Sequence, residues 1–124
     1  MSRPRRAAPD GGMVTAEIAV ALPALVALLA VALTAVDVVG GHLKCVDAAR
    51  EAARGAARGD APAVVRSLAG RSAPPGARVV LTGDDSQVNV RVQAVVRPLG
   101  GFLPAFTVDG RAVAAREPGE VGVP

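Results

Sequence analysis

The chain has 124 residues, 51% of them hydrophobic, and a formal net charge of +3. This length fits one small domain, and the lack of Trp and Tyr, with only two Phe, argues against an aromatic-lined ligand site or a base-stacking surface. The single cysteine excludes an intrachain disulfide and a thiolate metal cluster. Three of the 14 basic residues lie in positions 1–12 and the rest of the chain is nearly balanced in charge, which disfavours nucleic-acid binding.

The first segment, residues 1–12, has the sequence MSRPRRAAPDGG. Its three arginines, two prolines and terminal glycine pair predict an unstructured leader that stays in the cytoplasm. Basic residues also lie within about 20 positions of the far end of the next segment, so charge alone gives only weak support for this orientation.

An apolar segment follows, in which the residues from Ile18 to Val36 carry no charge. At a rise of about 1.5 Å per residue this helix would span roughly 28 Å, which matches the hydrocarbon core of a bilayer. We therefore predict a transmembrane helix over residues 13–37. Pro23 lies inside it, either as a tolerated kink or as a local loosening that serves helix packing.

Glu17 stands at the edge of this apolar segment. An ionisable side chain is costly there, and its presence indicates a functional role with a specific partner.

An Ala-rich stretch at 38–59 predicts an extramembrane continuation of the same helix, with a weak point at Gly40-Gly41 where the helix could bend. One face carries Asp47, Arg50, Arg54 and Arg58, while the opposite face carries Val46, Ala49, Ala53 and Ala56. Such small side chains predict a shallow packing surface that another element can approach closely. Cys45 either packs as a small apolar residue or forms an intermolecular disulfide.

The remaining residues, 60–124, predict a small extracytoplasmic domain. Asp60 resembles a helix N-cap, and residues 63–69 predict a short second helix. Hydrophobic alternation then predicts strands at 79–81 and 88–93, separated by a turn at 83–86. After an irregular apolar loop at 98–104, residues 106–116 predict a last strand that is interrupted near Asp109-Gly110.

The predicted fold is therefore α+β, with a long N-terminal helix, a short helix and about three antiparallel strands. So small a domain needs a neighbour to be stable. We expect this neighbour to be the Ala face of its own long helix, or else another subunit that also covers the Phe102-Leu103 loop.

Candidate catalytic and metal sites are weak. His42-x-x-Cys45 supplies at most half of a metal site, and a single histidine near a membrane exit is a poor general base. Adjacent turn residues Asp84 and Asp85 have diverging side chains, so they do not form an acid and base pair. We predict no enzymatic activity, no metal, no cofactor and no small-molecule substrate.

The order of basic leader, Gly12, four residues, Glu17, apolar segment and Ala-rich helix resembles a type IV pilin-like precursor. Within that class, MVTAEIAVALPALVALLAVAL followed by CVDAAREAARGAARG is similar to the TadE-like minor pilins, or pseudopilins, of tight-adherence (Flp-type) systems. The spacing of Glu17, the position of Pro23 and the stretch from Ala48 to Arg54 carry the resemblance. It covers roughly residues 10–60.

The resemblance implies that a prepilin peptidase cuts between Gly12 and Met13, so that Glu17 becomes the fifth residue of the mature chain. The Glu17 carboxylate would then pair with the freed amine of Met13 on an adjacent subunit. The implied partners are the peptidase, other pilin subunits, an inner-membrane assembly platform and the lipid bilayer. The implied location is the cytoplasmic membrane, with the N-terminus inside and the C-terminal domain outside, and the pilus or cell surface after assembly.

Two other interpretations remain. One is an unprocessed single-pass anchor whose outer domain binds an envelope partner. The other is a conventional secretory signal cut near Ala30-x-Ala32, which is disfavoured because the apolar core is longer than the usual 7–15 residues.

Overall fold

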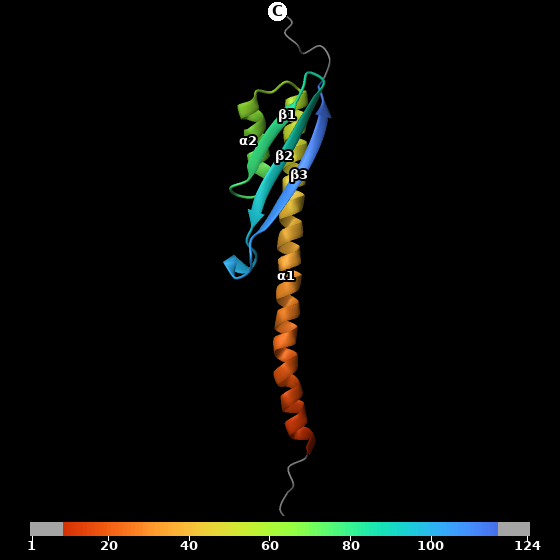
Figure 1. Ribbon diagram of the computed structural model, residues 1–124, viewed down its shortest axis with the longest axis vertical. Coiled ribbons are helices and arrows are strands. Elements are labelled where there is room, and N and C mark those ends of the chain that lie inside the picture. Colours follow the sequence, from red (N-terminus) through yellow and green to blue (C-terminus); the bar gives the residue numbers. More distant parts are fainter. Residues whose placement is uncertain (1–8, 117–124) are drawn as a thin grey trace, which may run out of the picture. The chain divides into compact units, whose positions relative to one another are not determined.

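The computed structural model describes residues 9–116, and its contacts divide the chain into two units, Met1–Leu33 and Thr34–Pro124. Helix α1 (Pro9–Ala57) runs from the first unit into the second without an interruption at Gly40-Gly41, where the sequence suggested a weak point (Figure 1). Our prediction of an unstructured leader is wrong for residues 9–12, which are helical; residues 1–8 lie outside the described part. Pro9 suits this helix start because its fixed φ is already helical and it needs no amide partner there.

In the first unit, residues 11–33 of α1 are exposed except for a half-buried Ala30. Pro23 lies inside this part of the helix. Pro23 has no N–H to donate, so one backbone bond of the helical ladder is missing there.

The second unit contains the last part of α1, helix α2 (Pro62–Ser72) and three strands. Our assignment of Asp60 as the N-cap of the short helix is wrong. The N-cap position is Ala61, which provides no side-chain cap, and Asp60 instead forms an ion pair with Arg58 at 3.2 Å. Pro62 begins the helix as Pro9 begins α1.

Strands β1 (Arg78–Gly83), β2 (Gln87–Val96) and β3 (Phe106–Ala115) form an antiparallel sheet in the order β1-β2-β3. A short 3-10 helix, η1 (Pro98–Gly101), lies in the connection between β2 and β3. The predicted α+β fold is thus confirmed, and its first two strands are longer than the sequence pattern indicated.

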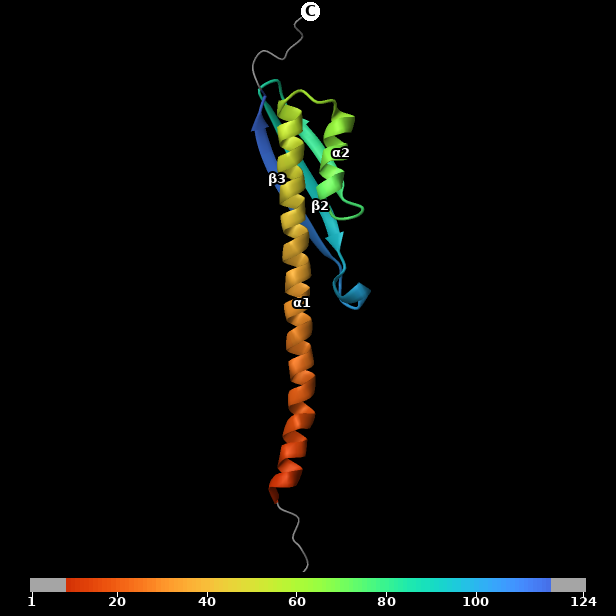
Figure 2. The same ribbon diagram turned by 180° about the vertical axis from the view of Figure 1, so that it is seen from behind.

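One face of this sheet is covered by helices, as Figure 2 shows for the last part of α1 and for α2. The buried residues of β2 alternate with exposed or half-buried ones, as expected for a half-buried strand. The core between these layers consists of small and branched side chains: Cys45, Ala48, Ala49, Ala52 and Ala53 from α1, Val65 and Ala69 from α2, and Val88, Val90, Val92, Ala94 and Val108 from the sheet. The sheet therefore packs on the Ala face of its own helix, as predicted.

Strand β3 continues without a break through Gly110, where we predicted an interruption. Gly110 pairs with Val92 inside the strand, and a Cβ built on it would lie only 2.3 Å from the carbonyl carbon of Cys45. The glycine lets the backbone of β3 approach the backbone of α1. Gly41 has a similar role, since a Cβ there would lie 2.6 Å from Cγ2 of Val96.

Candidate functional site

The sequence-predicted processing residues lie at the start of α1. Gly12, Met13 and Glu17 are all exposed, and the Thr15 hydroxyl donates a 3.0 Å hydrogen bond to the carbonyl of Gly11. The Gly12–Met13 bond is thus inside a helical turn, which a peptidase would have to unwind. Gly11 and Gly12 make unwinding easier, because each glycine is about 1 kcal/mol less favourable than alanine in a helix.

Glu17 has no hydrogen-bond or ion-pair partner within residues 9–116. It lies four residues after Met13, so the two positions share one face of the helix. A free amine at Met13 would be a positive charge at a helix N-terminus, where the helix dipole is unfavourable for cations. A carboxylate near that end would offset both the charge of the amine and the positive end of the helix dipole.

The apolar part of α1 qualifies as a membrane span. It lies in the one described helix that is long and apolar enough to cross a bilayer, with a mean hydropathy of 2.6 in its most apolar window and none of that window buried. Large side chains point outward all around it, including Leu22, Leu25 and Leu29 at 56–61% exposure. A helix that is apolar on every side requires an apolar environment.

The predicted packing residues lie in two different settings. Ala49 and Ala53 are buried against the sheet, Ala56 is half-buried, and Pro23 lies in the exposed apolar segment. The Ala face is therefore occupied by the chain's own domain rather than left open for a neighbouring helix. Sequence reasoning missed Ala48 and Ala52, although their spacing from Cys45 continues the same face.

Cys45 is fully buried between α1 and β3, with its Sγ 4.0 Å from the carbonyl oxygen of Val108. Burial raises the pKa of its thiol, and the nearby carboxylate of Asp109 raises it further. A protonated, enclosed thiol reacts slowly. An intermolecular disulfide would therefore require β3 to move away from the helix.

The residues His42 and Cys45 do not form a joint metal site, because His42 is exposed while Cys45 is enclosed. Within residues 9–116, no group of three or more His, Cys, Asp or Glu side chains could hold a metal ion.

Asp84 organises the turn between β1 and β2. Its Oδ1 accepts hydrogen bonds from the Ser86 hydroxyl at 2.6 Å and from the backbone N–H groups of Ser86 and Gln87 at 2.8 and 2.9 Å. These bonds favour the carboxylate, with the Ser86 hydroxyl contributing most, and they lower the pKa of Asp84. Its role is structural, since an acceptor set of this kind stabilises a turn.

On the outer face of the sheet, Arg91 and Arg111 lie directly opposite each other on neighbouring strands. Their like charges would destabilise the pair, but the Asp109 carboxylate lies 3.3 Å from Nε of Arg91 and 3.4 Å from Nε of Arg111. Asp109 therefore neutralises a local charge conflict.

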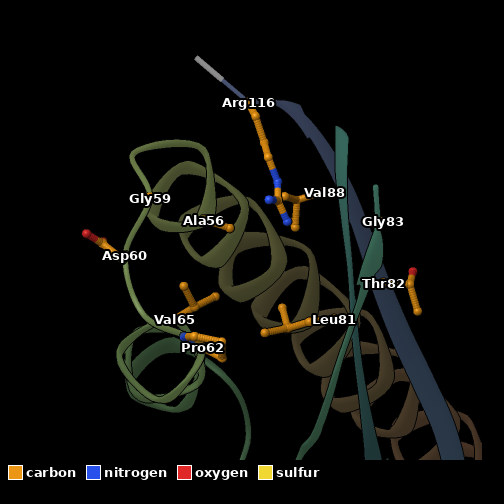
Figure 3. Close-up of a pocket in the computed structure, with 10 residues that line it drawn as sticks. All are labelled: Ala56, Gly59, Asp60, Pro62, Val65, Leu81, Thr82, Gly83, Val88 and Arg116. Atoms are coloured by element: carbon orange, nitrogen blue, oxygen red, sulfur yellow. The ribbon is translucent and has the colours of Figure 1, made fainter. Parts of the chain in front are cut away.

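A cavity of about 420 Å³ lies in the second unit where α1 ends and α2 begins (Figure 3). Its walls combine polar and apolar surface, and the Arg116 side chain reaches across it toward Val88, whereas Asp60 points away. The cavity thus offers one positive charge and no paired acid and base. Sequence reasoning missed it because its lining is drawn from segments far apart in the chain: Ala56, Gly59, Asp60, Pro62, Val65, Leu81, Thr82, Gly83, Val88 and Arg116.

Comparison with known proteins adds one relative. The chain is 40% identical over 105 residues to a Mycobacterium tuberculosis protein described as "Apoptosis inhibitor Rv3655c", with 83% of this chain and 78% of that protein covered. The chain belongs to the family of this mycobacterial protein. No protein-family model matches the chain, and no solved structure does.

The shared region with the Rv3655c family member is longer than the part of the chain from Thr34 to Pro124. It therefore includes some of the first unit as well as most of the small domain. The similarity is therefore not confined to the second unit.

Proposed function

We propose that this chain is a TadE-like minor pilin or pseudopilin, processed after Gly12 by a prepilin peptidase and acting in tight-adherence (Flp-type) pilus assembly or secretion. One observation carries the proposal. Glu17 is the fifth residue after Gly12, at the head of a helix whose apolar part is exposed on all sides. A carboxylate in that position requires a partner, and the described part of this chain supplies none.

Cleavage would create the partner. It converts the amide nitrogen of Met13 into a positive amine, and an adjacent subunit's Glu17 can approach this amine when apolar helices stack. Opposite charges about 4 Å apart attract by about 1 kcal/mol in water and about 4 kcal/mol at an effective dielectric constant of about 20. The pair would therefore favour one axial register between neighbouring subunits.

The division of α1 supports assembly through the same helix. Its later part is packed against the rest of the second unit from Val38 onward, while residues 11–33 have almost no cover from their own chain. Lipid surrounds this apolar segment before assembly, and neighbouring apolar helices replace the lipid afterwards. The partners would be the peptidase, other pilin subunits and an inner-membrane platform, with the N-terminus inside and the small domain outside.

The name of the mycobacterial relative describes inhibition of apoptosis. That name gives an effect on a cell and specifies neither a reaction nor a binding partner that could be matched to a residue here. We therefore do not extend it to this chain.

Processing can be tested by mass spectrometry of the protein recovered from cells that assemble pili. We expect a mature N-terminus at Met13. Gly12→Val should abolish the cut, whereas Gly11→Val, which changes the same kind of residue one position earlier, should leave it largely intact. An intact leader on the parent protein under these conditions would instead identify an unprocessed single-pass anchor.

The charge pair needs a separate test. Glu17→Gln keeps the size of the side chain and removes its charge, so processing should continue while incorporation into the assembled complex falls. Crosslinking between subunits measures that incorporation, with Asp37→Asn as a matched control beyond the apolar segment. Equal assembly of Glu17→Gln and the parent would show that the carboxylate has no pairing role.

A further inference from the structure

The connection between β2 and β3, residues 97–105, carries the most exposed large apolar side chain of the described chain. Phe102 is 93% exposed, and Leu103 beside it is half-buried. The connection is not a loose loop, because Pro98 is buried and the N–H of Phe102 donates a 3.3 Å hydrogen bond to the carbonyl of Leu99. An apolar side chain held out by a defined turn indicates a binding surface.

Backbone conformation supports the same conclusion. Leu99 has a φ of 53°, in the left-handed region that is unfavourable for a leucine, and Gly100 and Gly101 also have positive φ. The chain accepts this strain at the turn that presents Phe102. Strain of this kind is concentrated at functional positions.

The position of the connection identifies the binding partner. Val96, the last residue of β2, packs against Gly41 of α1, and Val36, the last residue of the uncharged apolar segment, is five residues before Gly41. Five helical residues correspond to about 8 Å. A hairpin connection of this length could extend up to about 16 Å beyond the strand ends, so it can reach the level at which α1 leaves the bilayer.

Charge at this end of the sheet also fits a lipid surface. Lys44 and Arg97 line a surface groove next to the connection, and Arg78 lines the neighbouring one, against a single carboxylate, Asp37. Long basic side chains at the edge of a bilayer direct their charges to lipid phosphates, while aromatic and aliphatic side chains between them enter the interface. Figure 1 shows η1 beyond the ends of β2 and β3, on the side from which α1 enters the second unit.

We propose that residues 97–105 form a membrane-interface anchor, in which Phe102 and Leu103 insert into the outer leaflet beside the span and Arg97 and Lys44 contact phospholipid headgroups. The anchor fixes the small domain against the bilayer before any assembly. It requires that the apolar segment of α1 spans the membrane, and it does not depend on cleavage after Gly12.

A single tryptophan tests this anchor, because the parent chain contains none. The full chain with Phe102→Trp is reconstituted in phosphatidylcholine and phosphatidylglycerol vesicles, with or without bromine on the acyl chains near the headgroups. We expect blue-shifted emission and a large loss of fluorescence in the brominated vesicles. Phe102 is outside the core, so circular dichroism of this variant should match the parent.

Two other tryptophan variants serve as controls, one expected to lie in the bilayer and one expected to lie in water. Leu25→Trp, near the middle of the apolar segment, should be quenched in vesicles whose acyl chains carry bromine near their ends, and Val113→Trp, an exposed position at the other end of the sheet, should emit as in water without quenching. The anchor is overturned if Phe102→Trp behaves like Val113→Trp. Blue-shifted but unquenched emission would also overturn it, because protein from a second copy would then cover the side chain.

Failure of the span itself has a different signature. An unquenched Leu25→Trp would reject both the span and the anchor. Mass spectrometry of the N-terminus reports on cleavage independently of either result.

Discussion

The two parts of α1 use hydrophobic residues in opposite ways. In the first part, large side chains such as Val20 and Val26 are 73% and 64% exposed, whereas in the second part small side chains such as Ala49 are fully buried. Hydrophobicity alone therefore does not locate the core of this chain. Large apolar residues mark the part that needs lipid or another apolar partner, and small ones mark the part that another backbone approaches closely.

This contrast follows from what each part must contact. Acyl chains adapt to any side-chain shape, so the first part can carry Leu and Val on every face. A sheet is a fixed surface, and the backbone of α1 can lie against it at Gly110 only because this residue has no side chain.

The largest expected effect comes from filling that close contact. Gly110→Val places its Cβ where the structure leaves 2.3 Å to the Cys45 carbonyl carbon, and the obstacle is backbone, which cannot swing aside. We expect destabilisation of about 3 kcal/mol or more, at or above the usual 1–3 kcal/mol of overpacking. Hydrogen exchange of the β2 amides in detergent-solubilised protein measures the change.

Gly70→Ala is the matched control for this substitution. Gly70 lies in α2 with open space around it, and alanine is favoured over glycine in a helix by about 1 kcal/mol. Its β2 amides should be protected at least as well as those of the parent. If Gly110→Val were equally harmless, the close approach of β3 to α1 would be wrong.

A smaller effect separates the two parts of the comparison directly. Val92 is completely buried in the sheet and Val26 is exposed in the apolar segment. Val92→Ala should lower the stability of the small domain by about 2 kcal/mol, whereas Val26→Ala, the same change of side chain, should leave it unaltered. Hydrogen exchange of the β2 amides again measures the change. Equal losses of stability in both variants would mean that the apolar segment and the small domain do not differ as described.

The sequence allowed the prediction of the elements whose pattern is local. The uncharged segment from Ile18 to Val36, the alternation from Val88 to Val92 and the Ala-rich face around Ala49 each repeat with the period of their structure. The α+β class and the packing of the sheet on the Ala face follow from those patterns. The turn at Asp84 was also predicted correctly, because the Gly and Asp residues there favour tight turns.

The errors occurred at residues whose role differs from the one that their local pattern suggests. Gly110 looks like a strand break in the sequence and is a contact point with Cys45 in the fold. Asp60 looks like a helix cap, but pairs with Arg58 instead. The cavity beside Arg116 and the strained turn at Leu99 likewise depend on tertiary arrangement, so no local pattern could reveal them.

The smallest expected effect concerns Cys45, and it tests whether the second part of α1 stays covered. Burial, with a contribution from Asp109, raises the pKa of its thiol above the ordinary value of 9.0, so the folded domain holds this proton more tightly than the unfolded chain. Below pH 9.0 both states keep the proton and this contribution to stability is complete. As pH rises through the folded pKa the contribution is lost, and a pH series of urea denaturation should show the decline for the parent and not for Cys45→Ala.

Thiol labelling compares the buried Cys45 with a cysteine placed at an exposed position of the same helix. Leu43, two residues before Cys45 on the same helix, is 56% exposed. In a Cys45→Ala/Leu43→Cys variant the thiol should react with maleimide at the rate of a free cysteine, while the parent reacts only when the sheet opens. Equal rates in the two proteins would show that β3 does not cover Cys45, and an intermolecular disulfide at this position would then become accessible.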